Sequence, residues 1–392
     1  MHLILIFALI TFNPIIEVEQ VQTALEEHYP GETWNIKEFG DGNINYIYRA
    51  ENTQKGKKTI LVKKALDYAR IDPVAFPLPI GRLSFEHQAY VEYQKSAPDR
   101  IPEIYFYDEP NGMLAMEYLS PHIILRRGLL EGKKYPLLAE HLGSFLGRSL
   151  YLTSKYHLSD ANWQENVAYF ADNTEMRKII ENLNFTHPFQ NSTSNRWTSP
   201  ELDDIVLEIQ QDSELKSLVH ALKRKFLNFP EALSHGDLHT GSVLVTKYDT
   251  RVFDTEFASY APISFDIGML LANYAMASIA SEAHGTDKIW LSSLISSTWE
   301  SFETSFTNLW ANDEISVDEK IQEIWQDTVR LMGVEIIRRT IGVAHNADFE
   351  KISDRPLKAQ IEREALEFAR ELILESSDTF TDAYEIEARL VS

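Results

Sequence analysis

The chain contains no cysteine among its 392 residues. Disulfides, zinc–thiolate sites and thiol catalysis are therefore excluded, and the absence fits a reducing compartment such as the cytoplasm. Basic residues are also scarce, with 37 Lys and Arg against 59 Asp and Glu and a formal net charge of −22. Because that charge repels phosphate backbones, we expect no nucleic-acid partner. An anionic substrate would need a local basic pocket or a metal ion.

Long hydrophobic runs are missing as well. The most apolar segment, HLILIFALIT at residues 2–11, is too short to span a bilayer. It has the length of a signal-peptide core, but no Lys or Arg precedes it and no small-residue cleavage site follows it. A strand, a helix or a misassigned start is therefore favoured over a secretory or anchoring role, and we expect no membrane partner.

The first third of the chain has the pattern of a small sheet. Residues 34–39, 44–50 and 59–64 alternate β-branched or aromatic residues with polar ones, and turn residues separate them. A helix is predicted at 82–94, and two more strands at 103–108 and 112–119. Five strands and one helix predict an α+β lobe over residues 1–118.

Beyond Ser120 the pattern changes to long amphipathic helices. We predict them at 135–157, 200–228, 266–280, 315–345 and 354–377, the last capped by Ser353. One β-like segment at 242–257 interrupts them, and the polar stretch 190–200 is predicted as a surface loop. Since 392 residues exceed the size of one hydrophobic core, we expect a second lobe at 119–392, with a hinge near 117–120.

The most specific chemical pattern is HGDLHTGS at 235–242, followed by Asp-Thr-Glu at 254–256. Phosphoryl transfer needs one carboxylate to accept the proton of the attacking hydroxyl and others to hold Mg²⁺. We assign Asp237 as the base and Asp254 and Glu256 as metal ligands. Each motif alone is also typical of a polar turn or a solvated hairpin end, but their spacing across a predicted hairpin favours chemistry.

A glycine-rich turn at Gly40–Asn43 joins the first two predicted strands. Glycines there let backbone amides approach phosphates, although the same residues form an ordinary hairpin turn. Lys63 ends the third strand, where its ammonium group can reach phosphates or simply extend into water. Glu86, on the predicted helix, can pair with Lys63 or lie on the surface.

Several segments resemble the 5-methylthioribose kinases, within the aminoglycoside phosphotransferase-like branch of the protein-kinase-like superfamily. They are GDGNINYIYR, LVKKAL, AMEYLS, HIILRRGLL, HGDLHTGSV, DTEFASYAPISFDIG and RRTIGVAH, in the family's order over residues 15–375. The resemblance implies a bilobal protein-kinase-like fold of α+β class. Its small N-lobe is a five-stranded antiparallel sheet and its large C-lobe is mostly helical.

The resemblance also implies an activity: transfer of the γ-phosphate of ATP, with Mg²⁺, to the 1-hydroxyl of methylthioribose in methionine salvage. It implies a cytoplasmic homodimer. Arg338 and Arg339 are expected beside Asp237 at the substrate site, whereas by spacing alone they would be a helix surface. Asp266 is expected to brace the catalytic loop. The implied nucleotide-binding residues are Gly40, Asp41, Gly42, Asn43, Lys63, Glu117, Tyr118 and Ser242.

The sequence departs from the family's usual pattern at a few places. Ser242 stands where related kinases often carry Asn, Thr255 where the family usually has Pro, and Tyr118, Ala261 and Ser264 differ near the expected nucleotide or substrate contacts. These changes concern the exact acceptor rather than the reaction. The alternatives are another kinase of this fold acting on choline, homoserine, an aminoglycoside or a sugar, a catalytically dead nucleotide-binding regulator, and an α+β structural or interaction protein.

Overall fold

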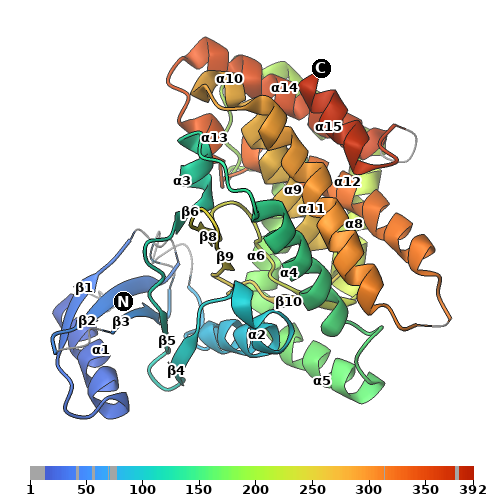
Figure 1. Ribbon diagram of the computed structural model, residues 1–392. Coiled ribbons are helices and arrows are strands. Elements are labelled where there is room, and N and C mark those ends of the chain that lie inside the picture. The colour runs from blue at the N-terminus through green and yellow to red at the C-terminus, as the bar shows by residue number, and fades with distance from the viewer. Residues whose placement is uncertain are drawn as a thin grey trace, which may run out of the picture. The chain divides into compact units, whose positions relative to one another are not determined.

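The computed structural model describes residues 14–40, 44–54, 58–68, 70, 77–312, 314–375 and 379–392. The chain divides into two compact units (Figure 1). The smaller unit comprises residues 1–84 and 103–118, and the larger unit residues 85–102 and 119–392. The apolar segment 2–11 and the turn residues 41–43 lie outside the described residues, so the expectations for them stay predictions.

The smaller unit is built on one antiparallel sheet of five strands in the order β1-β2-β3-β5-β4. Its strands are β1 (Trp34–Glu38), β2 (Tyr46–Asn52), β3 (Thr59–Lys64), β4 (Ile104–Asp108) and β5 (Met113–Glu117). The predicted five-stranded antiparallel lobe is therefore confirmed. A helix that the sequence pattern did not predict, α1 (Pro14–His28), precedes the sheet.

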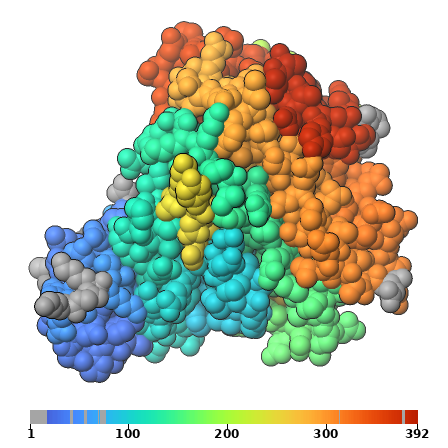
Figure 2. Space-filling model, viewed as in Figure 1, coloured from blue at the N-terminus to red at the C-terminus, as the bar shows by residue number. Residues whose placement is uncertain are grey.

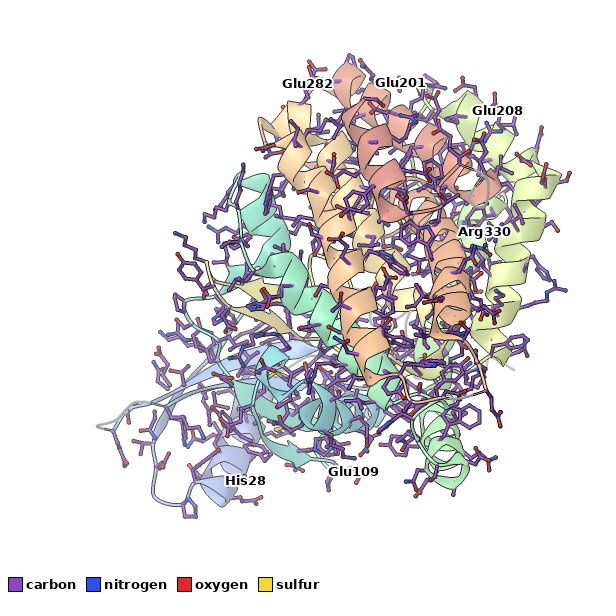
Figure 3. The ribbon with its side chains drawn as sticks, turned by 45° about the vertical axis from the view of Figure 1, so that its right-hand side comes forward. His28, Glu109, Glu201, Glu208, Glu282 and Arg330 are labelled. Carbon is purple, nitrogen blue, oxygen red and sulfur yellow. The ribbon has the colours of Figure 1, made fainter. Side chains whose placement is uncertain are left out.

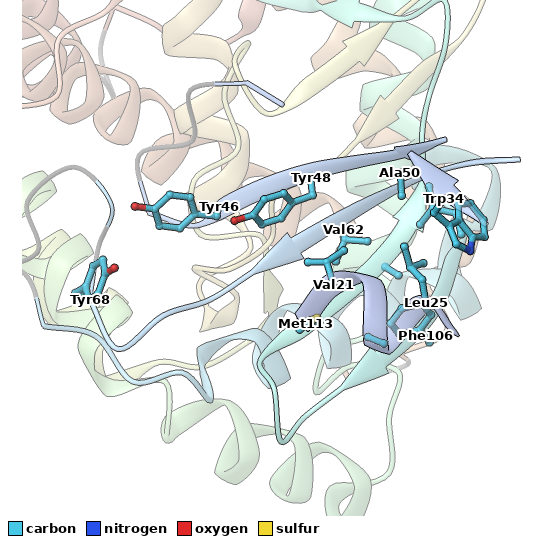
Figure 4. Close-up of a cluster of buried hydrophobic side chains, with 13 residues drawn as sticks. Val21, Leu25, Trp34, Tyr46, Tyr48, Ala50, Val62, Tyr68, Phe106 and Met113 are labelled. Atoms are coloured by element: carbon cyan, nitrogen blue, oxygen red, sulfur yellow. The ribbon is translucent and has the colours of Figure 1, made fainter. Parts of the chain in front are cut away.

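An apolar cluster joins α1 to one face of this sheet (Figure 4). Tyr46, Tyr48 and Ala50 alternate with less buried residues along β2, as the two-residue period of a strand requires. They share the cluster with Val21 and Leu25 of α1. Burying an apolar side chain of this size contributes about 1.5–3 kcal/mol to the free energy of folding. A shift of the strand by one residue would expose all of these side chains, so the alternation determines which face of the sheet α1 covers.

The larger unit is mostly helical, as predicted. Its helices are α2 (Arg82–Ser96, whose first turn belongs to the smaller unit), α3 (Leu125–Leu130), α4 (Leu138–Leu152), α5 (Asp160–Ala171), α6 (Thr174–Phe185), α7 (Asp203–Gln211), α8 (Ser213–Asn228), α9 (Ser264–Ile279), α10 (Ser281–His284), α11 (Lys288–Leu309), α12 (Val317–Ile341), α13 (Ala347–Glu350), α14 (Arg355–Leu374) and α15 (Ala383–Val391), with short 3₁₀ turns at Pro98–Arg100 and His187–Phe189.

Helix α9 is the centre of this unit, because every one of its residues is buried. Its sequence is hydrophobic on all sides, as expected of a helix enclosed by others. Helix α12 packs against α9 and α14, and α11 packs against α4 (Figure 1). Charged residues such as Glu208 on α7 and Glu282 on α10 lie on the outside of the bundle (Figure 3). No helix in the described part of the chain is both long and apolar enough to cross a membrane.

The helices α5, α6 and α15 were not predicted, and three further differences from the predicted helices have a physical cause. The segment 200–228 forms two helices, because the Asp212 side chain caps α8 by accepting from the amides of Glu214 and Leu215. Helix α14 is capped by Asp354 rather than by Ser353. The 22-residue helix α11 was not predicted, since its many Ser and Thr residues have low helix propensity and obscure the apolar stripe.

Two small sheets lie in and beside the segment 242–257, which the sequence pattern predicted as β-like. Strands β8 (Val243–Val245) and β9 (Thr250–Val252) form the predicted hairpin, and β6 (Ile123–Ile124) pairs with β8. The tip of this hairpin reaches the surface beside the green segments that contain β6 and α4 (Figure 2). Strand β7 (Ala232–Ser234) pairs with β10 (Ser259–Ala261). The loop that follows β7 carries the HGD motif.

A buried ion pair fastens α12 to the base of β7. The ammonium group of Lys320 lies 2.7 Å from Oε1 of Glu231, and only 3% of the lysine side chain is exposed. The Tyr156 hydroxyl donates to the same carboxylate at 2.8 Å, and the Ile263 amide donates to its other oxygen at 3.3 Å. Because so many donors converge, the pKa of Glu231 is lowered although burial alone would raise it.

Replacing Lys320 by Ala should cost about 3–5 kcal/mol of stability, because it leaves the Glu231 carboxylate buried without its main cation. The matched control is Lys133→Ala, which removes a lysine that is 51% exposed and paired with Glu131, itself 39% exposed; such a surface pair contributes little to stability. Urea unfolding of both variants measures the difference. Equal losses would mean that the buried pair has no special role in holding α12.

Candidate active site

The HGD loop after β7 is bound by the buried carboxylate of Asp266, which lies in the first turn of α9. Asp266 accepts hydrogen bonds from the Ser234 hydroxyl at 2.8 Å, the His235 amide at 2.6 Å and the Gly236 amide at 3.1 Å. Burial raises the pKa of Asp266, and these donors oppose the rise. The structure therefore places Asp266 where a brace for the loop is needed, with its oxygens directed at the loop backbone.

Gly236 is required at the bend of this loop. Its φ is +86°, and a Cβ at this position would lie 2.2 Å from the carbonyl oxygen of Phe257. Both the left-handed backbone and the close approach exclude a side chain. The loop can therefore turn sharply enough to present Asp237 while its backbone stays against the segment that follows Glu256.

Asp237 lies among cationic and imidazole groups of the larger unit. Its Oδ1 accepts from Arg339 at 3.1 Å and from two nitrogens of Arg338 at 3.4 Å. Its Oδ2 lies 3.2 Å from Nε2 of His239. A quarter of the Asp237 side chain remains exposed. The residues predicted as base and substrate clamp are thus brought together by the fold.

This environment keeps Asp237 ionised. Burial alone would raise the pKa of its carboxyl group, but His239, Arg338 and Arg339 outweigh that effect and hold the pKa well below its usual range. An ionised carboxylate with an exposed edge can accept a hydroxyl proton, orient a hydroxyl by hydrogen bonding, or both. The site therefore has the chemistry of a general base beside a cationic clamp.

The two adjacent arginines in the last turn of α12 are buried. The alternative prediction, that they lie on an exposed helix surface, is therefore wrong. Arg338 and Arg339 are 7% and 5% exposed, and a carboxylate that sequence reasoning missed, Glu335, fixes them. Oε2 of Glu335 accepts from Arg338 at 2.8 Å and Oε1 accepts from Arg339 at 2.6 Å. The available signal was the spacing, because a Glu three and four residues before two arginines faces both of them on a helix.

A second group of carboxylates lies near the loop after β9. Oxygen atoms of Glu86, Asp254 and Glu256 lie within 4.8 Å of one another. Glu86 is fully buried on α2, so its interpretation as a surface residue was wrong. Three carboxylates converging on one point provide the oxygen ligands that Mg²⁺ and Ca²⁺ prefer, so these residues fit a hard divalent cation.

The backbone around these carboxylates is specifically supported. Asp254 has φ of +70°, an uncommon conformation for a residue with a side chain, and its amide donates to the Tyr90 hydroxyl at 2.9 Å. The hydroxyl of Thr255 lies 3.3 Å from the Glu86 carbonyl, a bond that proline could not make. His235 contacts the Phe253 carbonyl at 2.9 Å, so the HGD loop and the carboxylate loop are tied together.

A further cluster of possible metal ligands, His345, Glu350 and Glu362, already contains a cation of the protein. Lys358 lies 2.6 Å from Glu350 and 3.7 Å from Glu362. Arg196 also pairs with Glu350, at 3.2 Å. The arrangement is an ion-pair network between α14 and the segments before it.

Ser242 is buried and supports the catalytic loop. Its hydroxyl can donate to the carbonyl oxygen of Asp237 at 3.0 Å or of His239 at 2.9 Å, and it accepts from the His239 amide at 2.9 Å. A hydroxyl oxygen has two lone pairs, so one remains after this acceptance. Its role as a nucleotide or metal contact stays a prediction.

The smaller unit carries the other predicted contacts. Gly40, two residues after the end of β1, has φ of +78°, a backbone conformation that favours glycine, while Asp41, Gly42 and Asn43 lie outside the described residues. Lys63 lies opposite Leu114 of β5 and is 5% exposed, so the alternative of a lysine extending into water is wrong. Glu117 ends β5, and Arg49 lies 4.8 Å above the ring of Tyr118.

Comparison with known proteins agrees with this geometry. The profile of the phosphotransferase enzyme family matches residues 35–302. A methylthioribose kinase of Escherichia coli O45:K1 (strain S88 / ExPEC) is 39% identical over 369 residues, covering 88% of this chain and 87% of the relative. One of Bacillus cereus (strain 03BB102) is 37% identical over 372 residues, covering 92% and 93%.

A solved structure, that of choline kinase from Cryptosporidium parvum Iowa II, shares the fold with a TM-score of 0.51 and 13% identity, covering 96% of this chain and 100% of that one. The chain therefore belongs to the phosphotransferase enzyme family, and within it to the methylthioribose kinases. The resemblance seen in the sequence motifs is confirmed, and so is the bilobal kinase-like fold of α+β class.

Replacing Glu335 by Gln should destabilise the protein by about 3 kcal/mol at neutral pH, because two buried guanidinium groups lose a charge that balances them. The pKa of Glu335 is lowered, since its arginine partners outweigh burial. Its contribution is therefore fully present above the ordinary glutamate pKa of about 4.3 and is lost as the pH falls through the lowered value.

Unfolding free energies measured from pH 7 downward should thus show the wild type and Glu335→Gln converging in acid. Glu208→Gln, which changes an exposed glutamate on α7, is the control and should follow the wild type at every pH. A gap between wild type and Glu335→Gln that stays constant with pH would contradict the charge-balancing role.

Proposed function

We propose that this chain is an ATP-dependent kinase that transfers the γ-phosphate to the 1-hydroxyl of 5-methylthioribose, a step of methionine salvage. The observation that carries the proposal is the ionised Asp237 carboxylate held by Arg338 and Arg339. Identity to methylthioribose kinases over about nine-tenths of the chain supports the choice of acceptor.

In the proposed reaction Asp237 orients the acceptor hydroxyl and takes its proton as the new oxygen–phosphorus bond forms. The bond between the γ-phosphorus and the bridging oxygen of ATP breaks, and ADP leaves with that oxygen. Arg338 and Arg339 stabilise the negative charge of the transferring phosphoryl group through planar, multidentate contacts. Phosphoryl transfer requires little covalent chemistry from the protein, so most of the rate would come from positioning and electrostatics. The low pKa of Asp237 keeps the carboxylate ionised at neutral pH but also makes it a weak base. Its main role would therefore be to orient the hydroxyl, and it would accept the proton late, as the bond to phosphorus forms.

We assign the divalent cation to Asp254 and Glu256, with Glu86 as the carboxylate beside them. Mg²⁺ is the specific ion proposed; when bound, it would neutralise charge on the nucleotide phosphates. Ser242 is assigned as a further contact of the nucleotide or its metal ion, through the lone pair that its hydroxyl oxygen keeps. The residues assigned to the nucleotide in the smaller unit are Gly40, Asp41, Gly42, Asn43, Lys63, Glu117 and Tyr118.

The cellular setting is part of the proposal as well. We infer a cytoplasmic enzyme, which the complete lack of cysteine supports. A homodimer is the assembly implied by the resemblance to methylthioribose kinases. Nucleic acid is not among the proposed partners, because the net charge of −22 repels phosphate backbones. A membrane partner is not proposed either, because the apolar segment 2–11 is too short to span a bilayer.

The acceptor is tested with a panel of methylthioribose, ribose, choline and homoserine, with ATP and Mg²⁺, reading the phosphorylated product by mass. Methylthioribose should be the preferred substrate by kcat/KM. Preference for choline or homoserine would identify another kinase of this fold. No turnover with any acceptor, together with stabilisation by Mg·ATP, would favour a nucleotide-binding regulator.

Within this assay, Asp237→Ala should lower kcat by on the order of 10²–10⁴-fold, since the base and its orientation are lost. The variant should still bind ATP, as measured by the shift in its melting temperature. The matched control, Asp204→Ala, removes an aspartate that is 66% exposed on α7 and should leave kcat unchanged. An active Asp237→Ala protein would refute the assignment of the base.

The metal assignment predicts that Asp254→Asn and Glu256→Gln each raise the Mg²⁺ concentration needed for half-maximal activity by about tenfold or more, because each removes a charged oxygen ligand. A titration of Mg²⁺ at saturating ATP measures this shift. Glu282→Gln, at an exposed position of α10, serves as the control. An unchanged Mg²⁺ dependence in both variants would place the metal elsewhere.

A further inference from the structure

His239, two residues after Asp237, contacts groups that determine where its proton lies. Its Nδ1 is 2.7 Å from the amide of Gly241 and 3.0 Å from a terminal nitrogen of Arg126. Its other ring nitrogen, Nε2, is 3.2 Å from Oδ2 of Asp237. The ring therefore lies between two donors on one side and the proposed base on the other.

The tautomer follows from the chemistry of these neighbours. A backbone amide and a guanidinium group can only donate, so Nδ1 must accept and carries no proton. In a neutral imidazole the proton is then on Nε2, which donates to the Asp237 carboxylate. Burial, with Arg339 and Arg126 nearby, outweighs the attraction of Asp237 and lowers the pKa of His239 to about 4, so the ring is neutral at pH 7.

We propose that His239 is a positioning residue for catalysis: as a neutral imidazole with its proton fixed on Nε2, it holds the Asp237 carboxylate in its reactive orientation. This inference deepens the kinase function proposed above and rests on it for its kinetic consequences. Arg338 and Arg339 bind Oδ1, whereas His239 binds Oδ2. With both oxygens held, the carboxylate cannot rotate freely about its Cβ–Cγ bond.

Arg126 is the anchor of this arrangement. Besides His239, its guanidinium donates to the Thr240 hydroxyl at 3.0 Å and to the Asn273 side chain at 2.9 Å. Its backbone amide donates to the Thr240 carbonyl at 2.9 Å. Asp348 lies 3.8 Å from its Nε. Arg126 belongs to α3, and these contacts come from α9, α13 and the loop itself, so the guanidinium is fixed independently of any substrate.

The tautomer can be measured without any assay of activity. In the ¹⁵N-histidine-labelled wild-type protein near pH 7, His239 should show an unprotonated, imine-type Nδ1 and a protonated, pyrrole-type Nε2. Its signals are identified by their loss in His239→Gln. A protonated Nδ1, or a doubly protonated ring, would overturn the inference, whatever substrate the enzyme uses.

Two variants then separate positioning from simple loop support. The amide nitrogen of Gln occupies the place of Nε2, so His239→Gln keeps a donor toward Asp237 and should retain kcat within about tenfold of wild type. The amide of Asn occupies the place of Nδ1, so His239→Asn keeps an acceptor for Gly241 but loses the donor. Its kcat should fall by on the order of 10²-fold, while KM for ATP changes little.

The pH profile gives an independent readout. A donor on a carboxylate stabilises its charged form, so removing it raises the carboxyl pKa. The acid limb of kcat/KM should therefore move to higher pH in His239→Asn and stay near the wild-type position in His239→Gln. Equal kcat losses in both variants with unchanged acid limbs would assign His239 to loop structure alone. If wild type is inactive on every acceptor, the proposed function fails, while the tautomer measurement still decides the histidine.

Discussion

The site depends on the balance of charge around one partly buried carboxylate. Asp237 can remain ionised in its partly enclosed position because Arg338 and Arg339 lie against it, and those two cations can be buried because Glu335 accepts from both. Two negative and two positive side chains thus offset one another. In a chain with a net charge of −22, this local pairing keeps two guanidinium groups beside Asp237, where the proposed reaction brings an anionic phosphoryl group.

The backbone holds that balance in place through contacts between segments distant in the sequence. Asp266 accepts a hydrogen bond from the backbone of the turn before Asp237, and Gly236 lets that turn bend against the carbonyl of Phe257. The side chain of His235 contacts the carbonyl of the residue before Asp254. These contacts come from β7, α9 and the loop after β9. Catalytic and metal-binding side chains are therefore set by one packed framework, as positioning within a fraction of an ångström requires.

Local patterns predicted much of the molecule. The alternation along β2 and the HGD turn follow from short-range sequence, whereas the burial of Lys63 on β3 decides between two alternatives that the sequence left open. Relations that need tertiary packing were missed. Glu335 is an ordinary helix glutamate until α12 is seen to be enclosed, and the role of His239 requires Arg126, which lies more than a hundred residues earlier. Helix α11 was hidden because its Ser and Thr side chains weaken the apolar period that packing later completes.

The most direct test of this account is the titration of Asp237 itself, followed through its carboxyl carbon by NMR in the wild type and in Arg338→Met. The account predicts that the wild-type carboxylate stays ionised well below the ordinary aspartate pKa of about 3.9, and that loss of one guanidinium moves its titration to higher pH. An Asp237 that titrates at the ordinary value in the wild type, or is unaffected by Arg338→Met, would contradict the central claim that paired arginines keep this carboxylate charged.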